Sequence, residues 1–279
     1  MSTFYVVGTP IGNLEDITLR ALKVLGSVDL ILCEDTRMTK RLLDRHLITA
    51  RTMSYHAQSA LSRTDEIIGF LREGKNLALV SDAGTPGISD PGSHLVSKIR
   101  ERLKEDIESG GVRIEVIPGP SALTAALSIA GVPCADFTFL GFLPHKKGRE
   151  TLFKEIKDSE RSMVFYESPH RIIKTLESLV EHMGDSVSLN GVADSRVSSN
   201  NSPDAISLRD NSHHPRNSQI GIDTPPPESK DSQKIITICR ELTKIFEEVV
   251  SGSPQEVLNY FNGHADKIKG EFVVIVSQK

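Results

Sequence analysis

Short apolar runs along this chain each stop at a block rich in glycine, proline and acidic residues, and this alternation constrains the fold most. The blocks lie at 8–14, 33–37, 81–92, 117–122 and 165–171. Over the first half of the chain, strand-like and helix-like patterns alternate, which is typical of a β-α-β arrangement. In an open α/β sheet, ligands bind where loops leave the carboxyl ends of strands. The sequence therefore predicts an α/β fold in which five loops form one site, and it indicates an enzyme.

The apolar spacing also predicts where the elements lie. In the first half we expect strands at 4–7, 28–32, 77–80 and 113–117, and helices at 16–25, 39–47, 66–71, 93–107 and 122–130. Ser121 is expected to cap the last of these helices, and Gly131 to end it. In the second half we expect strands at 137–142, 162–165, 235–239 and 272–276, and helices at 148–156, 171–180 and 254–261. These patterns predict two α/β domains, at 1–131 and 132–279.

Residues 185–234 interrupt the second domain. This stretch has no aromatic residue, about eleven serines and a run of three prolines. Such a composition cannot bury enough apolar surface to offset the entropy lost when a chain is ordered. We therefore interpret it as a disordered insertion, either a solvated linker or a proline-rich ligand for a partner module. An insertion of this kind favours a eukaryotic source.

Composition narrows the class of protein. Hydrophobic residues make up 38% and charged residues 25% of the chain, as in a soluble globular protein. No apolar stretch is long enough for a membrane span, and the N-terminus enters a strand pattern without a signal or transit segment. The three cysteines do not have the spacing of metal ligands, so no metal is expected.

The net charge of −4 argues against indiscriminate binding of nucleic acid, which usually requires a basic domain. An RNA substrate would have to meet a local basic patch. The densest cluster of cations is the run 145–149, which contains Lys146, Lys147 and Arg149, with Arg161 and Arg171 as possible extensions. Taken alone, such a run is also typical of a solvated loop.

Three motifs in this order carry a specific resemblance: Ser-Asp-Ala-Gly-Thr-Pro at 81–86, Phe-Tyr-Glu-Ser-Pro-His-Arg at 165–171 and Arg-Glu-Leu-Thr-Lys at 240–244. From Phe4 to Met183 and again from Ile235 onward, the chain resembles the class III, tetrapyrrole-methylase-type methyltransferases. Within them it is similar to the branch that methylates the ribose 2′-oxygen of a cytidine in small-subunit ribosomal RNA. The resemblance implies two α/β domains with the methyl donor, S-adenosyl-L-methionine, in the cleft between them. It also implies a homodimer in the cytoplasm, or in an organelle if the source is eukaryotic.

The loop after the run 77–80 is the most informative for the donor. Asp82 follows four apolar residues, so its carboxylate can accept hydrogen bonds from a ligand hydroxyl or amino group. The alternative is that Asp82 caps a turn that Pro86 makes rigid. The resemblance places ten residues at the donor site: Thr9, Pro10, Asp82, Gly84, Thr85, Ile88, Ser121, Ala122, Tyr166 and Leu242.

The remaining polar residues are candidates for acceptor binding and catalysis. The block Glu34-Asp35-Thr36-Arg37 follows the second expected strand, where it either forms a stabilising pair or a helix cap, or positions the acceptor. The substrate-binding candidates are Glu34, Arg37, Lys146, Lys147, Arg149 and Arg171. A ribose hydroxyl is a poor nucleophile until its proton begins to leave, so a base or a nearby cation is useful. Glu167 and Lys244 are the catalytic candidates.

Two other functions compete with RNA methylation. One is methylation of a tetrapyrrole at the same donor site, and the other is an inactive methylase fold that serves as an interaction scaffold. The lysine-rich loop and the motif at 165–171 favour RNA, because they resemble the RNA-directed branch. The intact glycines and acidic residues at the strand ends count against a scaffold that has lost its site.

Overall fold

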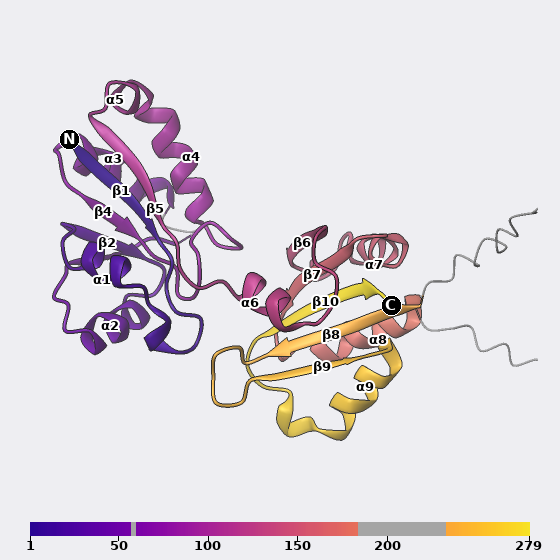
Figure 1. Cartoon of the computed structure of the whole chain (residues 1–279). Coiled ribbons are helices and arrows are strands. Elements are labelled where there is room, and N and C mark those ends of the chain that lie inside the picture. The colour runs from indigo at the N-terminus through magenta and orange to yellow at the C-terminus, as the bar shows by residue number, and fades with distance from the viewer. Residues whose placement is uncertain (57–59, 184–232) are drawn as a thin grey trace, which may run out of the picture. The chain divides into compact units, whose positions relative to one another are not determined.

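The structure of the chain is a computed structural model, and it describes residues 1–56, 60–183 and 233–279 (Figure 1). Two five-stranded sheets are present in this part of the chain, with orders β3-β2-β4-β1-β5 and β6-β7-β10-β8-β9. Helices pack against both sheets, so the predicted α/β fold is confirmed.

The first sheet is parallel throughout. Its strands are β1 (Ser2–Val7), β2 (Leu30–Cys33), β3 (Thr52–Ser54), β4 (Leu77–Leu79) and β5 (Val112–Ile117). Its helices are η1 (Leu14–Asp16), α1 (Leu19–Leu25), α2 (Thr36–Arg45), α3 (Ala60–Arg72), α4 (Gly92–Arg102) and α5 (Lys104–Glu108). All five strands point the same way, so their carboxyl ends lie at one edge of the sheet.

The first sheet is buried on both faces, and this explains its continuous apolar runs. In β2, Leu30 and Leu32 join the core cluster that contains residues of α3 and α4. Ile31 and Cys33 join the cluster that contains residues of α1 and α2. Successive side chains of a strand point to opposite faces, so a strand covered on both sides must be apolar at every position.

The second sheet is mixed. Its strands are β6 (Phe137–Phe142), β7 (Ser162–Glu167), β8 (Lys234–Arg240), β9 (Glu248–Gly252) and β10 (Phe272–Gln278). Strands β6 and β7 are parallel, whereas β10 is antiparallel to its neighbours β7 and β8 and lies in the middle of the sheet. Its helices are α6 (Ala122–Ile129), α7 (Arg149–Asp158), α8 (Ile172–Met183), α9 (Pro254–Gly263) and η2 (Ala265–Lys267).

The two faces of the second sheet are covered differently. Helices α7, α8 and α9 contribute Phe153, Leu176 and Phe261 to the core on one face. On the other face, Ala126 and Ala130 of the α6 region pack in a cluster with Val164 and Ile275. Helix α6 therefore packs on the second sheet, although the domain boundary that we predict at residue 131 places it in the first domain.

Several helix boundaries differ from the predictions, and capping side chains explain two of them. The helix expected from residue 16 begins at Leu19, because the Thr18 hydroxyl accepts a hydrogen bond from the Ala21 amide. Helix α2 begins three residues earlier than expected, because Asp35 caps it by accepting from the Arg37 amide. Ser121 occupies the N-cap position of α6, but its side chain forms no capping hydrogen bond.

The structure also adds elements that the sequence did not indicate. Strands β3 and β9 were not expected, and the single helix expected at 93–107 is divided into α4 and α5. Lys234, which we assigned to the insertion, is the first residue of β8. Gln233 is also described, whereas residues 185–232 of the predicted insertion lie outside the described residues. No helix in the described part of the chain is long and apolar enough to cross a membrane.

Candidate active site

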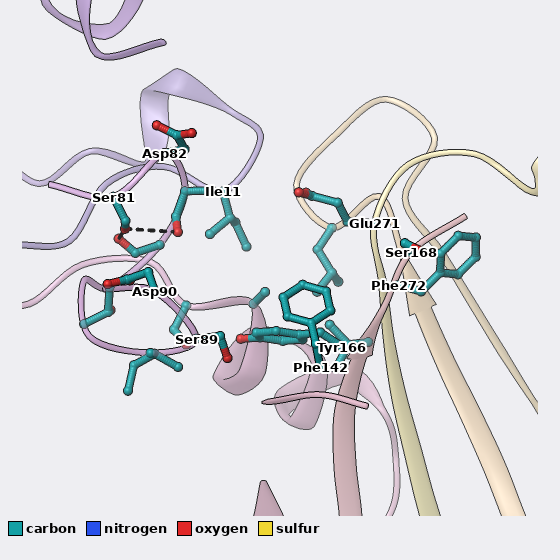
Figure 2. Close-up of a pocket in the computed structure, with 18 of the residues that line it drawn as sticks. Ile11, Ser81, Asp82, Ser89, Asp90, Phe142, Tyr166, Ser168, Glu271 and Phe272 are labelled. Carbon is teal, nitrogen blue, oxygen red and sulfur yellow. Dashed lines mark hydrogen bonds between the residues drawn. The ribbon is translucent and has the colours of Figure 1, made fainter. Parts of the chain in front are cut away.

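Loops that follow strands of both sheets line a hollow of about 370 Å³. Figure 2 shows its two sides, with Ser81, Asp82 and Asp90 on one and Glu271 and Phe272 on the other. This volume is in the range of pockets for small molecules.

The loop after β4 forms much of the first side. The backbone groups of Thr9 and Gly84 exchange two hydrogen bonds, with N···O distances of 2.9 and 3.1 Å. The Thr9 hydroxyl donates to the Ser81 carbonyl at 3.1 Å, and Thr9 is buried. Gly84 has a φ of +81°, which disfavours a side chain, and an added Cβ would lie 3.4 Å from Ile11. Thr9 therefore holds this loop in place, and Ile11 reaches the hollow.

Carboxylates give the first side an acidic character. Asp82 is exposed, and its Oδ1 accepts a hydrogen bond from the Asp35 amide at 3.0 Å. Asp90 accepts from the amides of Gly87 and Gly92, and so folds the loop back on itself. Burial, followed by the charges of Asp90 and Asp82, raises the pKa of Glu34. This side of the hollow therefore favours a ligand that carries positive charge.

Aromatic side chains form part of the second side. The ring of Tyr166 packs edge-on against Phe139 and Phe142, with centroid distances of 5.0 and 5.5 Å. Burial raises the pKa of the Tyr166 hydroxyl, so the phenol stays protonated. Phe142 is 56% exposed and lines the hollow, which leaves an aromatic face available to a planar ligand.

The loop after β8 lies at the rim of the hollow in a strained conformation. Glu241 and Thr243 have backbone φ angles of 49° and 66°, which residues other than glycine rarely adopt. Between them, Leu242 lines the hollow. The Thr243 hydroxyl accepts a hydrogen bond from the Asn13 amide at 3.1 Å, which links this loop to the one after β1.

Lys244 lies beside the hollow but does not line it. Its Nζ donates to carboxylates of Glu241, at 2.8 Å, and of Glu271, at 3.3 Å. Burial lowers the pKa of Lys244, but the hydrogen bonds and charges of these two carboxylates outweigh it, so the pKa is raised. Lys244 therefore stays protonated, which suits a cation that holds Glu271 at the rim and does not suit a general base.

Glu167 differs from the expectation of a catalytic base. Its carboxylate is fully buried. Oε1 accepts from the Ser168 amide at 2.8 Å and Oε2 accepts from the Thr175 hydroxyl at 2.7 Å, while Arg171 Nε lies 3.3 Å from Oε1. Both oxygens are therefore already paired with protein groups at the wall of the hollow, which favours a structural role, and catalysis by Glu167 stays a prediction.

The expected phosphate-binding cations fall into two groups. Lys146 and Lys147 are exposed. Arg149 is buried, with Nη2 donating to the Thr175 hydroxyl at 2.7 Å, and burial, followed by the Arg171 charge, lowers its pKa. Arg171 donates to the Leu143 carbonyl at 2.7 Å. Both guanidinium groups therefore already have partners within the protein, and phosphate binding by either of them stays a prediction.

Arg37 also lies apart from the hollow. Its guanidinium pairs with Asp35, with an Nη2–Oδ2 distance of 2.7 Å, and lowers the pKa of that carboxyl to about 2. Arg37 lines a separate hollow beside α2, together with Lys40 and Thr52. Among the acceptor candidates, Glu34 alone lines the main hollow.

Eight of the ten residues expected at the donor site line the hollow: Asp82, Gly84, Thr85, Ile88, Ser121, Ala122, Tyr166 and Leu242. Thr9 and Pro10 are buried and do not line it. Sequence reasoning missed several lining residues: Ile11, Ser89, Asp90, Phe142, Glu271 and Val273. Ile11, Ser89 and Asp90 belong to blocks that were recognised, whereas Glu271 has no local signal beyond its place before an apolar strand.

Comparison with known proteins gives the class of this fold. Residues 3–191 match the family model of Tetrapyrrole (Corrin/Porphyrin) Methylases. The crystal structure of the methyltransferase CobJ covers 100% of this chain and 95% of its own length, with a TM-score of 0.56 and 17% identity. Uroporphyrin-III C-methyltransferase from Thermus thermophilus covers 99% of this chain and 94% of its own, with a TM-score of 0.55 and 17% identity. The fold and the family match define a methyltransferase of the tetrapyrrole-methylase type.

Sequence relatives narrow the family further. Ribosomal RNA small subunit methyltransferase I from Thermotoga maritima is 37% identical over 279 residues, which are 100% of this chain and 100% of the relative. The protein of the same name from Escherichia coli O157:H7 is 37% identical over 98% of this chain and 76% of its own length. The chain belongs to the ribosomal RNA small subunit methyltransferase I family.

Proposed function

We propose that this protein transfers a methyl group from S-adenosyl-L-methionine to the ribose 2′-oxygen of a cytidine in small-subunit ribosomal RNA. The observation that carries this proposal is the full-length similarity to ribosomal RNA methyltransferases, combined with an acidic and aromatic hollow formed from the family motifs. Structures of tetrapyrrole methyltransferases share only the fold, at 17% identity or less, so they give the small-molecule alternative less support.

The hollow fits the methyl donor. Gly84 and Ala122 leave space beside the backbone, and the exposed carboxylate of Asp82 suits the hydroxyl or amino groups of the donor. The carboxylates of the first side also favour a cationic ligand. The donor, when bound, supplies a methyl group already activated by its sulfonium charge. The protein therefore mainly has to align donor and acceptor, and such alignment can supply a large part of the rate gain.

The second side suits an unstacked nucleotide. Phe142 offers an exposed ring for stacking, which is how proteins commonly hold the bases of single-stranded RNA. Lys146 and Lys147 are exposed cations for phosphates. Lys244 remains the candidate for the cation that favours loss of the hydroxyl proton, because its raised pKa keeps it charged.

The family resemblance supports further proposals about the whole protein. We infer two domains, at 1–131 and 132–279, a homodimer, and a cytoplasmic location, or an organellar one in a eukaryotic source. Size-exclusion chromatography with light scattering tests the homodimer.

Labelled-methyl transfer tests the proposed function. The purified protein is incubated with S-adenosyl-L-methionine that carries a labelled methyl group, and with small ribosomal subunits or with a porphyrinogen. We expect label in RNA, located by mass spectrometry on the ribose of a cytidine. Label in the porphyrinogen alone would support the tetrapyrrole alternative. Absence of donor binding in calorimetry, together with no transfer to either acceptor, would support the scaffold.

A further inference from the structure

A chain of polar groups, three of them buried and one partly buried, connects the wall of the hollow to residues 145–149, which we call the basic loop. It consists of Glu167 at the end of β7, Thr175 on α8, Arg149 at the start of α7, and Arg171 just before α8. Thr175 is fully buried, and the exposed fractions of Glu167 and Arg149 are 1% and 8%. We name this set the Glu167 network.

The contacts within the network run in sequence. The Thr175 hydroxyl donates to Glu167 Oε2 and accepts from Arg149 Nη2, both at 2.7 Å. Glu167 Oε1 accepts from the amide of Ser168, a residue that lines the hollow, and it lies 3.3 Å from Arg171 Nε. A single hydroxyl therefore joins the carboxylate to one of the two guanidinium groups.

The network ends on the backbone that leads into the basic loop. Arg171 Nη2 donates to the Leu143 carbonyl at 2.7 Å and to the Pro144 carbonyl at 3.4 Å. Arg149 Nη1 also donates to the Pro144 carbonyl, at 3.3 Å. These two carbonyls directly precede the run 145–149, which carries the exposed Lys146 and Lys147.

We infer that Thr175 is a positioning residue, which through the Glu167 network fixes the basic loop relative to the hollow and so sets the affinity for RNA. This inference rests on the proposed function. Buried charges cost desolvation energy, and well-packed apolar residues of similar volume are often at least as stabilising. The ionic network adds a fixed geometry. Two guanidinium groups hold the carbonyls of Leu143 and Pro144, and so fix the backbone direction in which the basic loop starts.

The test compares Thr175→Val, which removes the hydroxyl and nearly keeps the volume, with the control Thr237→Val. Thr237 is also buried in the second sheet, and its hydroxyl pairs with Ser251 at 2.8 Å, away from the network. We expect Thr175→Val to raise the KM for RNA about tenfold, since a buried donor and acceptor lose their partner. The Kd for the methyl donor and the kcat should change little, and Thr175→Ser, which keeps the hydroxyl, should restore the KM.

Trypsin cleavage after Lys146 and Lys147, followed by mass spectrometry, measures the loop directly and needs no RNA. Thr175→Val should speed this cleavage, and Thr237→Val should not. If Thr175→Val does not fold, Arg171→Lys serves in its place, because a single ammonium nitrogen on a shorter stem cannot hold the two carbonyls and also lie beside Glu167 Oε1, as Nη2 and Nε of Arg171 do. Unchanged cleavage and unchanged KM in a folded network variant would overturn the inference. So would an equal effect of Thr237→Val, because the change would then reflect lost stability. If Thr175→Val speeds cleavage but the wild-type protein methylates no RNA, the proposed function is refuted and the positioning role of Thr175 in the loop is not.

Discussion

Two carboxylates at strand ends, Asp82 after β4 and Glu167 at the end of β7, occupy similar places in the two sheets but differ in their surroundings. Asp82 is exposed at the hollow, with one hydrogen bond from a backbone amide. Glu167 is buried, with both oxygens bound and an arginine at 3.3 Å. A strand end therefore does not by itself make a carboxylate a ligand-binding group. What decides its role is whether the following helix supplies a hydroxyl and a cation that bury it.

The sharpest test of this difference is stability. Glu167→Ala should lower the free energy of unfolding by about 3–5 kcal/mol, because Arg149 and Arg171 lose the charge that compensates them. Asp82→Ala, as the matched variant, should change it by less than about 0.5 kcal/mol. Urea denaturation of both variants measures these values. If Glu167→Ala is as stable as the wild type and binds RNA normally, but its kcat falls to near zero, Glu167 is a catalytic residue.

For donor binding, by contrast, we expect the change at Asp82 to have the large effect. Asp82→Asn is expected to weaken binding of S-adenosyl-L-methionine by about 1–3 kcal/mol, through loss of a charge-assisted hydrogen bond. Calorimetry on a folded variant measures the change, with Asp106→Asn as a control on an exposed carboxylate that pairs with Arg72. Equal affinities of wild type and Asp82→Asn would mean that the donor lies elsewhere.

The basic loop should contribute a smaller, salt-dependent effect. Changing Lys146 and Lys147 to Ala is expected to flatten the salt dependence of RNA binding by up to about two phosphate contacts. Arg149 is left out because its guanidinium is buried. The control is the pair Lys98 and Lys104 changed to Ala, since each already pairs with a glutamate on its own helix. An unaltered slope with full activity would place the phosphates elsewhere.

The smallest expected effect concerns Glu34, which lies on the same side of the hollow as Asp82. Its pKa is raised in the folded state, chiefly by burial, so its contribution to stability is present in acid and is lost as the pH rises through the raised pKa. Glu34→Gln should therefore have a higher Tm than wild type at about pH 8, and the difference should vanish near about pH 4. If the Tm difference between Glu34→Gln and wild type grew as the pH fell, the carboxylate of Glu34 would be stabilised in its charged form.

The sequence predicted the buried strands well, because burial on both faces leaves a signal in every residue. The runs Leu30–Cys33 and Leu77–Leu79 are examples. Strands β3 and β9 left no such signal, since both lie at sheet edges and none of their residues is fully buried. The start of α2 could have been found from Asp35, a residue type that commonly caps helices.

The site was predicted only in part, because a local motif does not show what will cover it. The motif at 81–86 placed Asp82 at the hollow, since its strand end and glycines act over short range. The role of Glu167 depends on Thr175, eight residues later, and on Arg149, eighteen residues earlier, which only the packed fold brings together. The burial of Arg149 was not foreseen for the same reason, because a run of cations does not show which of them points inward.

The central place of β10 has a consequence for synthesis of the protein on the ribosome. The last strand of the first sheet ends at Ile117, whereas the second sheet needs β10, from Phe272, to join the pair β6–β7 to the pair β8–β9. At usual elongation rates, the two points are separated by roughly 8–30 s. We expect the first sheet to be complete during translation. Within this interval the pair β6–β7, complete at Glu167, waits longest with an unpaired edge, whereas the pair β8–β9, complete at Gly252, waits only briefly for the final strand. The wait of β6–β7 is when the nascent chain is most open to aggregation and most in need of a chaperone.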